Sequence, residues 1–118
     1  MTKKTYYAFC TICLLAHESK TSLDLAKEMD TSREFIQHIA SKLRNAHIID
    51  IKNGCKGGYS LSRSLNEICV NDIFEAMGED ITFVDENDSN IYARKFFTDA
   101  GLKIRDAFNV TFDNICKK

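Results

Sequence analysis

Residues 21–63, TSLDLAKEMDTSREFIQHIASKLRNAHIIDIKNGCKGGYSLSR, decide the fold of this chain, because two capped helices and a glycine-rich hairpin follow one another there. Thr21 and Asp24 are a hydroxyl residue and a carboxylate three positions apart, a spacing that caps the start of a helix. Thr31 and Glu34 repeat this pattern after a corner of three residues. The second helix then has an apolar face formed by Phe35, Ile36, Ile39, Ala40 and Leu43. Two helices joined by so short a corner predict a helix-turn-helix.

A β-hairpin is expected after the second helix. In residues 48–54 the apolar pattern changes from helical to alternating and ends on Asn53-Gly54, which is a strong hairpin signal. The alternation resumes at residues 59–62. Glycines in the loop between allow a sharp turn and a close approach of the backbone to a phosphate. The loop lacks the Gly-Lys-Ser/Thr ending of a nucleotide-binding loop, so the hairpin predicts a wing.

A long helix is expected in the last 30 residues of the chain. Asp88 or Ser89 can cap it, and we expect it to run to about Ile115. An apolar seam with alternating steps of four and three residues follows it: Phe97, Gly101, Ile104, Phe108, Thr111 and Ile115. Such a helix would be about 40 Å long, longer than so small a head can cover. We therefore expect it to pair with the same helix of a second copy, the alternative being that it folds onto its own head.

Composition and charge fit one compact domain with an appendage. The chain has 118 residues, of which 44% are hydrophobic, and its net charge is −1. The charge is segregated, because residues 31–63 hold six basic and two acidic side chains, whereas residues 71–90 hold seven acidic and no basic ones. No apolar run reaches the roughly 20 residues of a membrane span, and the start does not resemble a signal peptide. We therefore expect a cytoplasmic protein with reduced cysteines and no membrane partner.

The expected fold is mainly α with a two-stranded β wing. Residues 1–78 are predicted to form a winged helix-turn-helix head, and residues 79–118 an acidic hinge and a long C-terminal dimerisation helix.

The five cysteines suggest two sites. Cys10, Cys13 and His17 share one face of a first helix expected at residues 4–18, but three ligands on an apolar face favour core packing over a metal site. Cys55 lies in the wing loop between two lysines, where positive charge favours the thiolate. It is the candidate thiol switch, and an incidental exposed thiol is the alternative. The other two cysteines belong to no motif that we can interpret.

Taken together, these patterns resemble the Rrf2 family of winged-helix transcriptional regulators, whose members include iron–sulfur, nitric-oxide-responsive and cysteine-metabolism repressors. The resemblance covers nearly the whole chain and is carried by residues 25–26, 32–46, 57–61, 68, 72–73 and 110–112. It implies a homodimeric regulator that binds double-stranded DNA at pseudo-palindromic operators, with the long helix as the dimer element. We expect a repressor, and an activator is the alternative.

The resemblance fails at one place. Family members that bind a cluster carry three closely spaced cysteines between the short helix and the long one, and residues 78–101 hold none. Their acidic side chains suit iron–sulfur chemistry poorly. We therefore expect no iron–sulfur cluster, metal or other cofactor, and the signal is left to a thiol modification, a small molecule or a partner protein.

The DNA contacts implied by the resemblance lie on the second capped helix and the wing. On the helix, the side chains off the apolar face are expected in the major groove: Ser32, Arg33, Glu34, Gln37, His38, Ser41 and Lys42. Gln37 can pair with adenine, and Arg33 with guanine or phosphate. The wing contacts expected at phosphates or in the minor groove are Lys52, Lys56, Gly57, Gly58, Tyr59 and Arg63. Tyr59 can equally anchor the hairpin on the head, and the alternative for His38 is a surface residue without a DNA contact.

Two other classes of function compete with this interpretation. A winged-helix module that binds protein, without specific DNA binding, would explain the acidic hinge and the low net charge. A cysteine-based redox enzyme is not supported, since no nucleophile lies near a base and an orienting third residue in a readable arrangement. We therefore expect no catalytic activity.

Overall fold

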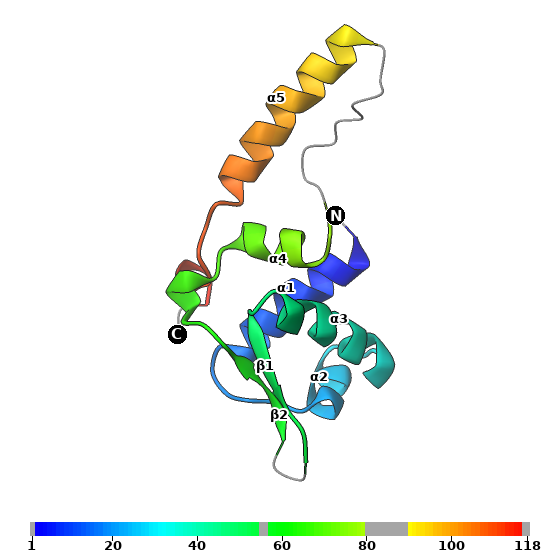
Figure 1. Ribbon diagram of the computed structural model, residues 1–118, viewed down its shortest axis with the longest axis vertical. Helices are drawn as coiled ribbons and strands as arrows, with labels where there is room; N and C mark the ends of the chain where they lie inside the picture. The colour runs from blue at the N-terminus through cyan, green and yellow to red at the C-terminus, as the bar shows by residue number, and fades with distance from the viewer. Residues whose placement is uncertain (1, 55–56, 80–89, 117–118) are drawn as a thin grey trace.

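The computed structural model describes residues 2–54, 57–79 and 90–116 (Figure 1). The helices are α1 (Lys3–Leu15), α2 (Ser22–Glu28), α3 (Arg33–Asn45), α4 (Val70–Ala76) and α5 (Ile91–Ala107). The strands are β1 (Ile49–Lys52) and β2 (Gly58–Leu61), and two short 3-10 turns are η1 (Leu65–Glu67) and η2 (Phe112–Asn114). Within these ranges, no helix combines the length and the hydrophobicity that a bilayer span requires. The expected fold, mainly helical with a two-stranded wing, is confirmed.

The helix-turn-helix begins as the sequence predicts at α2 and one residue later than predicted at α3. The Thr21 hydroxyl accepts from the Asp24 amide at 3.1 Å, and the Asp24 carboxylate accepts from the Thr21 amide at 3.0 Å. At α3 the capping residue is Ser32, whose hydroxyl accepts from the Phe35 amide, and not Thr31. The Thr31 amide instead donates to the carbonyl at the end of α2, which is why the second expected capping pattern does not form.

The core lies between α1, α3 and α4, with the hairpin closing one side (Figure 1). The face of α3 that looks inward consists of Ile36, Ile39, Ala40 and Leu43, all buried. Phe35, which the periodicity also assigns to this face, is only half-buried and meets the ring of Tyr7 edge-on at 5.2 Å. This packing fixes α3, so its opposite face is presented to solvent.

The wing is an antiparallel hairpin in which Ile51 pairs with Tyr59 and Lys52 with Gly58. A short third segment joins it, because Tyr59 exchanges both backbone hydrogen bonds with Lys20, at 2.7 and 3.1 Å. Lys20 directly precedes the cap of α2. The hairpin is therefore tied to the helix-turn-helix and cannot pivot freely around α3.

The C-terminal helix is shorter than the sequence suggests. Asn90 caps α5 by accepting from two amides of its first turn, and the helix ends at Ala107, so it measures about 26 Å at 1.5 Å per residue. The seam residues Phe97, Gly101 and Ile104 lie on α5, but Thr111 and Ile115 do not. The expected caps Asp88 and Ser89, like most of the acidic hinge, lie outside the described residues.

The segment after α5 returns to the head, which explains why the helix stops. The Val70 amide donates to Val110 O at 2.9 Å, and the Phe112 amide donates to Ile68 O at 3.0 Å. Phe112 is completely buried, with its ring 5.1 Å from that of Phe9 in α1. The assignment of Thr111 and Ile115 to a helical dimer seam was therefore wrong, because extended pairing and the burial of Phe112 stabilise another conformation.

Candidate nucleic-acid interface

A polar groove of about 190 Å³ lies where α2 and α3 face the wing. Its lining consists of Thr21, Ser22, Arg33, Gln37, Ile51, Lys52, Asn53, Gly54, Gly57, Gly58 and Tyr59. The fold therefore brings predicted DNA-contact residues of α3 and of the wing to one concave surface: Arg33, Gln37, Lys52, Gly57, Gly58 and Tyr59. Sequence analysis missed Ser22 and Asn53, because nothing in their local pattern shows that α2 and the hairpin face each other.

Arg33 is held in place by the helix before it. Its Nε donates to the Ser22 hydroxyl at 2.9 Å, and Ser22 is itself buried. The two terminal nitrogens of Arg33 have no partner among the described residues, so they can donate as a pair to a guanine edge or to a phosphate. The contact with Ser22 fixes the side chain before any ligand arrives, which lowers the entropic cost of binding.

The remaining outward positions of α3 differ in how free they are. Gln37 and Glu34 are exposed, and Ser41 is half-buried. Ser32 uses its hydroxyl to cap the helix. Glu34 is not used as a cap, so its carboxylate can accept a hydrogen bond from a ligand.

His38 and Lys42 lie on the other flank of α3, beside the start of α1. The Lys4 amine is 3.4 Å from His38 Nε2. Lys42 lines a hollow together with Lys3, Lys4 and one acidic residue, Glu79. The basic surface therefore extends from α3 to α1, a continuation that sequence analysis missed because only the tertiary fold brings these segments together.

The glycines of the wing serve the hairpin itself. A Cβ on Gly57 would lie 2.2 Å from Lys52 O, and one on Gly58 would lie 3.1 Å from Lys20 O. Gly54 adopts a φ of +106°, which is accessible to glycine alone at low cost. The ring of Tyr59 is 7% exposed, which supports its role as an anchor of the hairpin. Lys56 and Cys55 lie outside the described residues.

Arg63 does not extend toward a ligand, contrary to the expectation of a phosphate contact. Its guanidinium donates to the carbonyl oxygens of His47, Ala46 and Glu67 at 3.1 to 3.2 Å. The Asp72 carboxylate lies 3.7 Å away. The side chain satisfies carbonyl groups at the C-terminal end of α3, where the helix has no internal donors left.

Lys20 is likewise removed from the basic surface, although it lies next to the groove. Its amine is 2.9 Å from a Glu28 oxygen and 3.1 Å from a Glu18 oxygen. These hydrogen bonds, that of Glu28 first, raise the pKa of Lys20. Among the described residues, the exposed positive charge of the groove therefore comes from Arg33 and Lys52.

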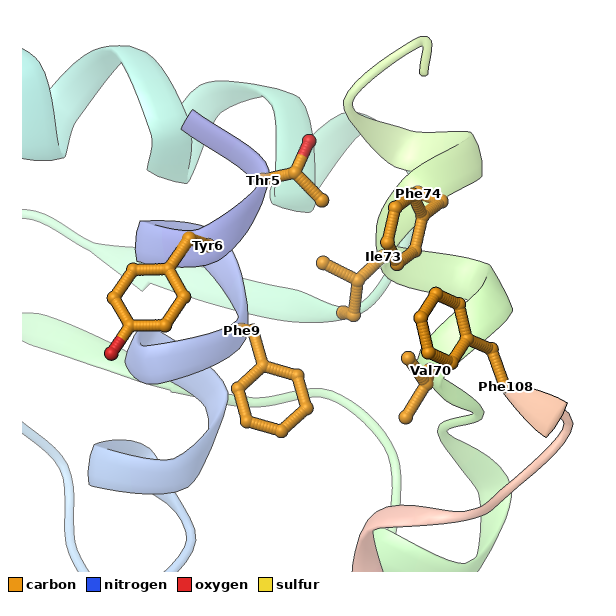
Figure 2. A pocket seen from close by; sticks show the side chains of 7 residues that line it. All are labelled: Thr5, Tyr6, Phe9, Val70, Ile73, Phe74 and Phe108. Atoms are coloured by element: carbon orange, nitrogen blue, oxygen red, sulfur yellow. The ribbon is translucent and has the colours of Figure 1, made fainter. Parts of the chain in front are cut away.

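A second, apolar hollow of about 210 Å³ lies between α1, α4 and the end of α5. It is lined by Thr5, Tyr6, Phe9, Val70, Ile73, Phe74 and Phe108. Figure 2 shows the rings of Phe9 and Phe108 on opposite sides of it, and Phe108 stacks on Phe74 with ring centres 5.3 Å apart. Of the described residues, only Thr5 and Tyr6 bring polar side chains to this hollow, so it suits an apolar occupant.

The residues between α4 and α5 do not fit an iron–sulfur cluster. They include no cysteine, and thiolates are the ligands that such clusters use. Elsewhere in the described parts of the chain, no three His, Cys, Asp or Glu side chains converge in a way that could hold a metal ion.

Known proteins match this chain in sequence and in fold. Residues 1–116 match the Rrf2 family, described as iron-dependent transcriptional regulators. The HTH-type transcriptional regulator IscR of Cereibacter sphaeroides is 30% identical over 87 residues, which are 69% of this chain and 56% of that protein. The chain thus spans little more than half the length of that relative.

Two solved structures share the fold over almost the whole chain. CymR (YrzC), the global cysteine regulator of B. subtilis, has a TM-score of 0.85 at 20% identity, with 98% of this chain and 95% of that chain covered. T. potens IscR has a TM-score of 0.80 at 18% identity, with 98% and 84% covered. At these identities the solved structures establish only the fold. The family match over residues 1–116 establishes the family. This chain belongs to the Rrf2 family of winged helix-turn-helix, DNA-binding transcriptional regulators.

Proposed function

We propose that the chain is a sequence-specific repressor that binds a pseudo-palindromic operator as a homodimer. The observation that carries the proposal is the groove in which Arg33 and Gln37 of α3 face Lys52 of the wing. Helix side chains of these types read base edges in the major groove, and a wing lysine neutralises phosphates beside it.

Within this proposal, Gln37 is the residue that selects adenine and Arg33 the residue that selects guanine. Gln37 is exposed, and none of the described residues hydrogen-bonds to its side chain, so its amide is available to a base. Arg33 is already oriented by Ser22 at 2.9 Å. Lys3, Lys4 and Lys42 would extend the phosphate contacts along the other flank of α3.

The proposed dimer rests on the apolar side chains that one copy leaves uncovered. Phe96 and Phe97 of α5 are 67% and 47% exposed. The apolar hollow between α1 and α4 lies near the base of the same helix. We place the seam at Phe97, Gly101 and Ile104, without the three predicted seam residues that lie beyond the helix end, Phe108, Thr111 and Ile115. Burying such side chains against a second copy removes apolar area from water, which stabilises a dimer.

A dimer of this kind would place two α3 helices in major grooves about 34 Å apart, one turn of DNA. Two small heads bound there would occlude the operator, which is why we propose a repressor. The effector is a protein, a small molecule or a thiol reagent, and the wing thiol Cys55 remains a candidate switch.

Selection from a pool of random DNA duplexes tests the proposal. Sequencing of the retained duplexes should yield a dyad-symmetric sequence with half-site centres about 10 base pairs apart. Gln37→Ala should lose the preference for one base in each half-site. Lys103→Ala, which changes an exposed side chain of α5, should enrich the same sequence as the wild type. Failure to enrich any sequence would favour the protein-binding module instead.

A further inference from the structure

Two thiols from opposite ends of the chain meet beside the core. Cys13 lies on α1 and Cys116 follows η2, and Cys116 lies close enough to raise the pKa of the Cys13 thiol. Both are free and half-buried. Cys10 lies one turn before Cys13 on the same helix, and it raises the pKa of the neighbouring Tyr6. No sequence pattern joins Cys13 to Cys116, because only the return of the chain after α5 brings them together.

Packing between Phe9 and Phe112 positions the segments that carry these two thiols. Phe9 and Phe112 place their rings 5.1 Å apart, and each precedes its cysteine by four residues. Phe9 and Cys13 are therefore one helical turn apart on α1. On the other side, the Cys116 amide donates to Phe112 O at 2.8 Å, which closes a turn of the same length. Each cysteine thus lies four residues after one ring of this contacting pair, and both cysteines pack, partly buried, on the same core.

We propose that Cys13 and Cys116 form a reversible dithiol–disulfide pair that joins α1 to the segment after α5. This inference concerns the chain itself and does not depend on the proposed operator. The oxidant is a low-molecular-weight disulfide, which accepts the two electrons that the thiols lose. One oxidant disulfide and two protein thiols become one protein disulfide and two small thiols, so that atoms and electrons balance.

The two cysteines have different roles in this exchange. Burial, followed by the hydrogen bond and charge of Cys116, raises the pKa of Cys13 to about 12, so Cys13 stays protonated at neutral pH. Cys116 attacks the oxidant first, losing its proton to solvent, and one small thiolate leaves. Cys13 then loses its proton to solvent and attacks the Cys116 sulfur of the mixed disulfide, and the second small thiolate leaves.

The disulfide would lock the pairing between residues 68–70 and 110–112, which sets where α5 leaves the head. It would also close a loop of about 100 residues. A cross-link that closes a long loop lowers the entropy of the unfolded chain more than one that closes a short loop, and so stabilises the fold more. Oxidation should therefore raise the melting temperature and hold α5 more firmly on the head.

Oxidation of the full chain with glutathione disulfide tests the proposal. Digestion without reductant, followed by mass spectrometry, should find the peptide of Cys13 linked to that of Cys116, and Tm should rise by more than about 10 °C and return with dithiothreitol. Cys116→Ser should abolish both changes. Cys69→Ser is the matched control and should keep both, since Cys69 donates to Phe108 O and Asn109 Oδ1 on the other side of the same segment. Linkage of Cys116 to Cys10, a persistent glutathione adduct on Cys116, or an unchanged Tm would each overturn the proposal.

Discussion

Arg63 and Lys52 show at the scale of single residues that a basic side chain near the wing can serve either the fold or a ligand. Arg63 has three of its donors on backbone carbonyl groups, whereas Lys52 is exposed and lines the groove. Neither role could be read from the sequence, where both are basic residues beside a glycine-rich hairpin. Charge counting identifies a basic region, but only the fold shows which of its charges are available.

Replacing these two residues should therefore have opposite effects. Arg63→Ala should lower the free energy of unfolding by about 2 kcal/mol, because several charge-assisted hydrogen bonds are lost and carbonyl groups are left without donors. Lys52→Ala should change it by less than about 0.5 kcal/mol, as exposed substitutions do. Urea titrations of both variants measure the difference. Equal destabilisation would contradict the role given to Arg63.

His47 carries backbone strain that a glycine would relieve. It ends α3 with a φ of +60°, and the next amide, that of Ile48, closes the helix on Leu43 O at 3.0 Å. A left-handed conformation costs a residue with a Cβ about 1–2 kcal/mol, and glycine avoids this cost. Glycine also loses more conformational freedom on folding, which offsets part of the gain. His47→Gly should thus stabilise the protein by about 0.5–1 kcal/mol.

Asn45→Gly is the matched control for this change, because Asn45 is exposed in the last turn of α3 and adopts a helical conformation. It should destabilise the protein by several tenths of a kcal/mol. Urea midpoints that fall in both variants would show that the conformation of His47 is not strained.

At the scale of elements, local chemistry could be predicted and long-range pairing could not. The Thr21 box, the apolar face of α3 and the Asn53-Gly54 hairpin each depend on neighbours within a few residues, and each was found. The end of α5 was missed, since apolar spacing continues past Ala107 while the chain instead pairs with residues 68–70. The contributions of α3 and the wing to the candidate DNA-binding site could be predicted from the sequence. The contribution of the α1 lysines could not.

Alanine substitutions at two wing glycines, Gly57 and Gly58, test the geometry of the hairpin. A Cβ at Gly57 would overlap the backbone at Lys52 O, whereas one at Gly58 would only be crowded by Lys20 O. Gly57→Ala should therefore force the hairpin to change shape and cost more than about 2 kcal/mol, and Gly58→Ala should cost about 1 kcal/mol or less. Hydrogen exchange of the Tyr59 amide, bonded to Lys20 O, reports on both variants. Similar protection in the two would contradict the steric argument.

At the scale of the whole molecule, one copy leaves its longest helix largely uncovered. Figure 1 shows α5 projecting from the head, and its Tyr92 is 84% exposed. The seam side of α5, with Phe97, and the opposite side, with Leu102, are both apolar and about half exposed. The proposed dimer uses only the first of these sides.

Two substitutions that each replace a large apolar side chain by serine test which side of α5 forms the dimer. Phe97→Ser should weaken dimerisation at least tenfold, since loss of a buried aromatic side chain at an interface commonly costs more than about 1.4 kcal/mol. Leu102→Ser should leave the dissociation constant within about threefold of the wild type. Sedimentation equilibrium measures both constants. A wild-type chain that stays monomeric, or equal effects of the two variants, would refute the proposed seam.

The central claim is that the groove between α3 and the wing binds DNA, and the salt dependence of that binding tests it most directly. Fluorescence anisotropy with the selected duplex should show the logarithm of the binding constant falling linearly with the logarithm of salt concentration. Lys52→Ala should reduce the slope by about 1, and Arg63→Ala should leave it unchanged. An affinity that does not depend on salt, or a slope unchanged by Lys52→Ala but reduced by Arg63→Ala, would contradict the account.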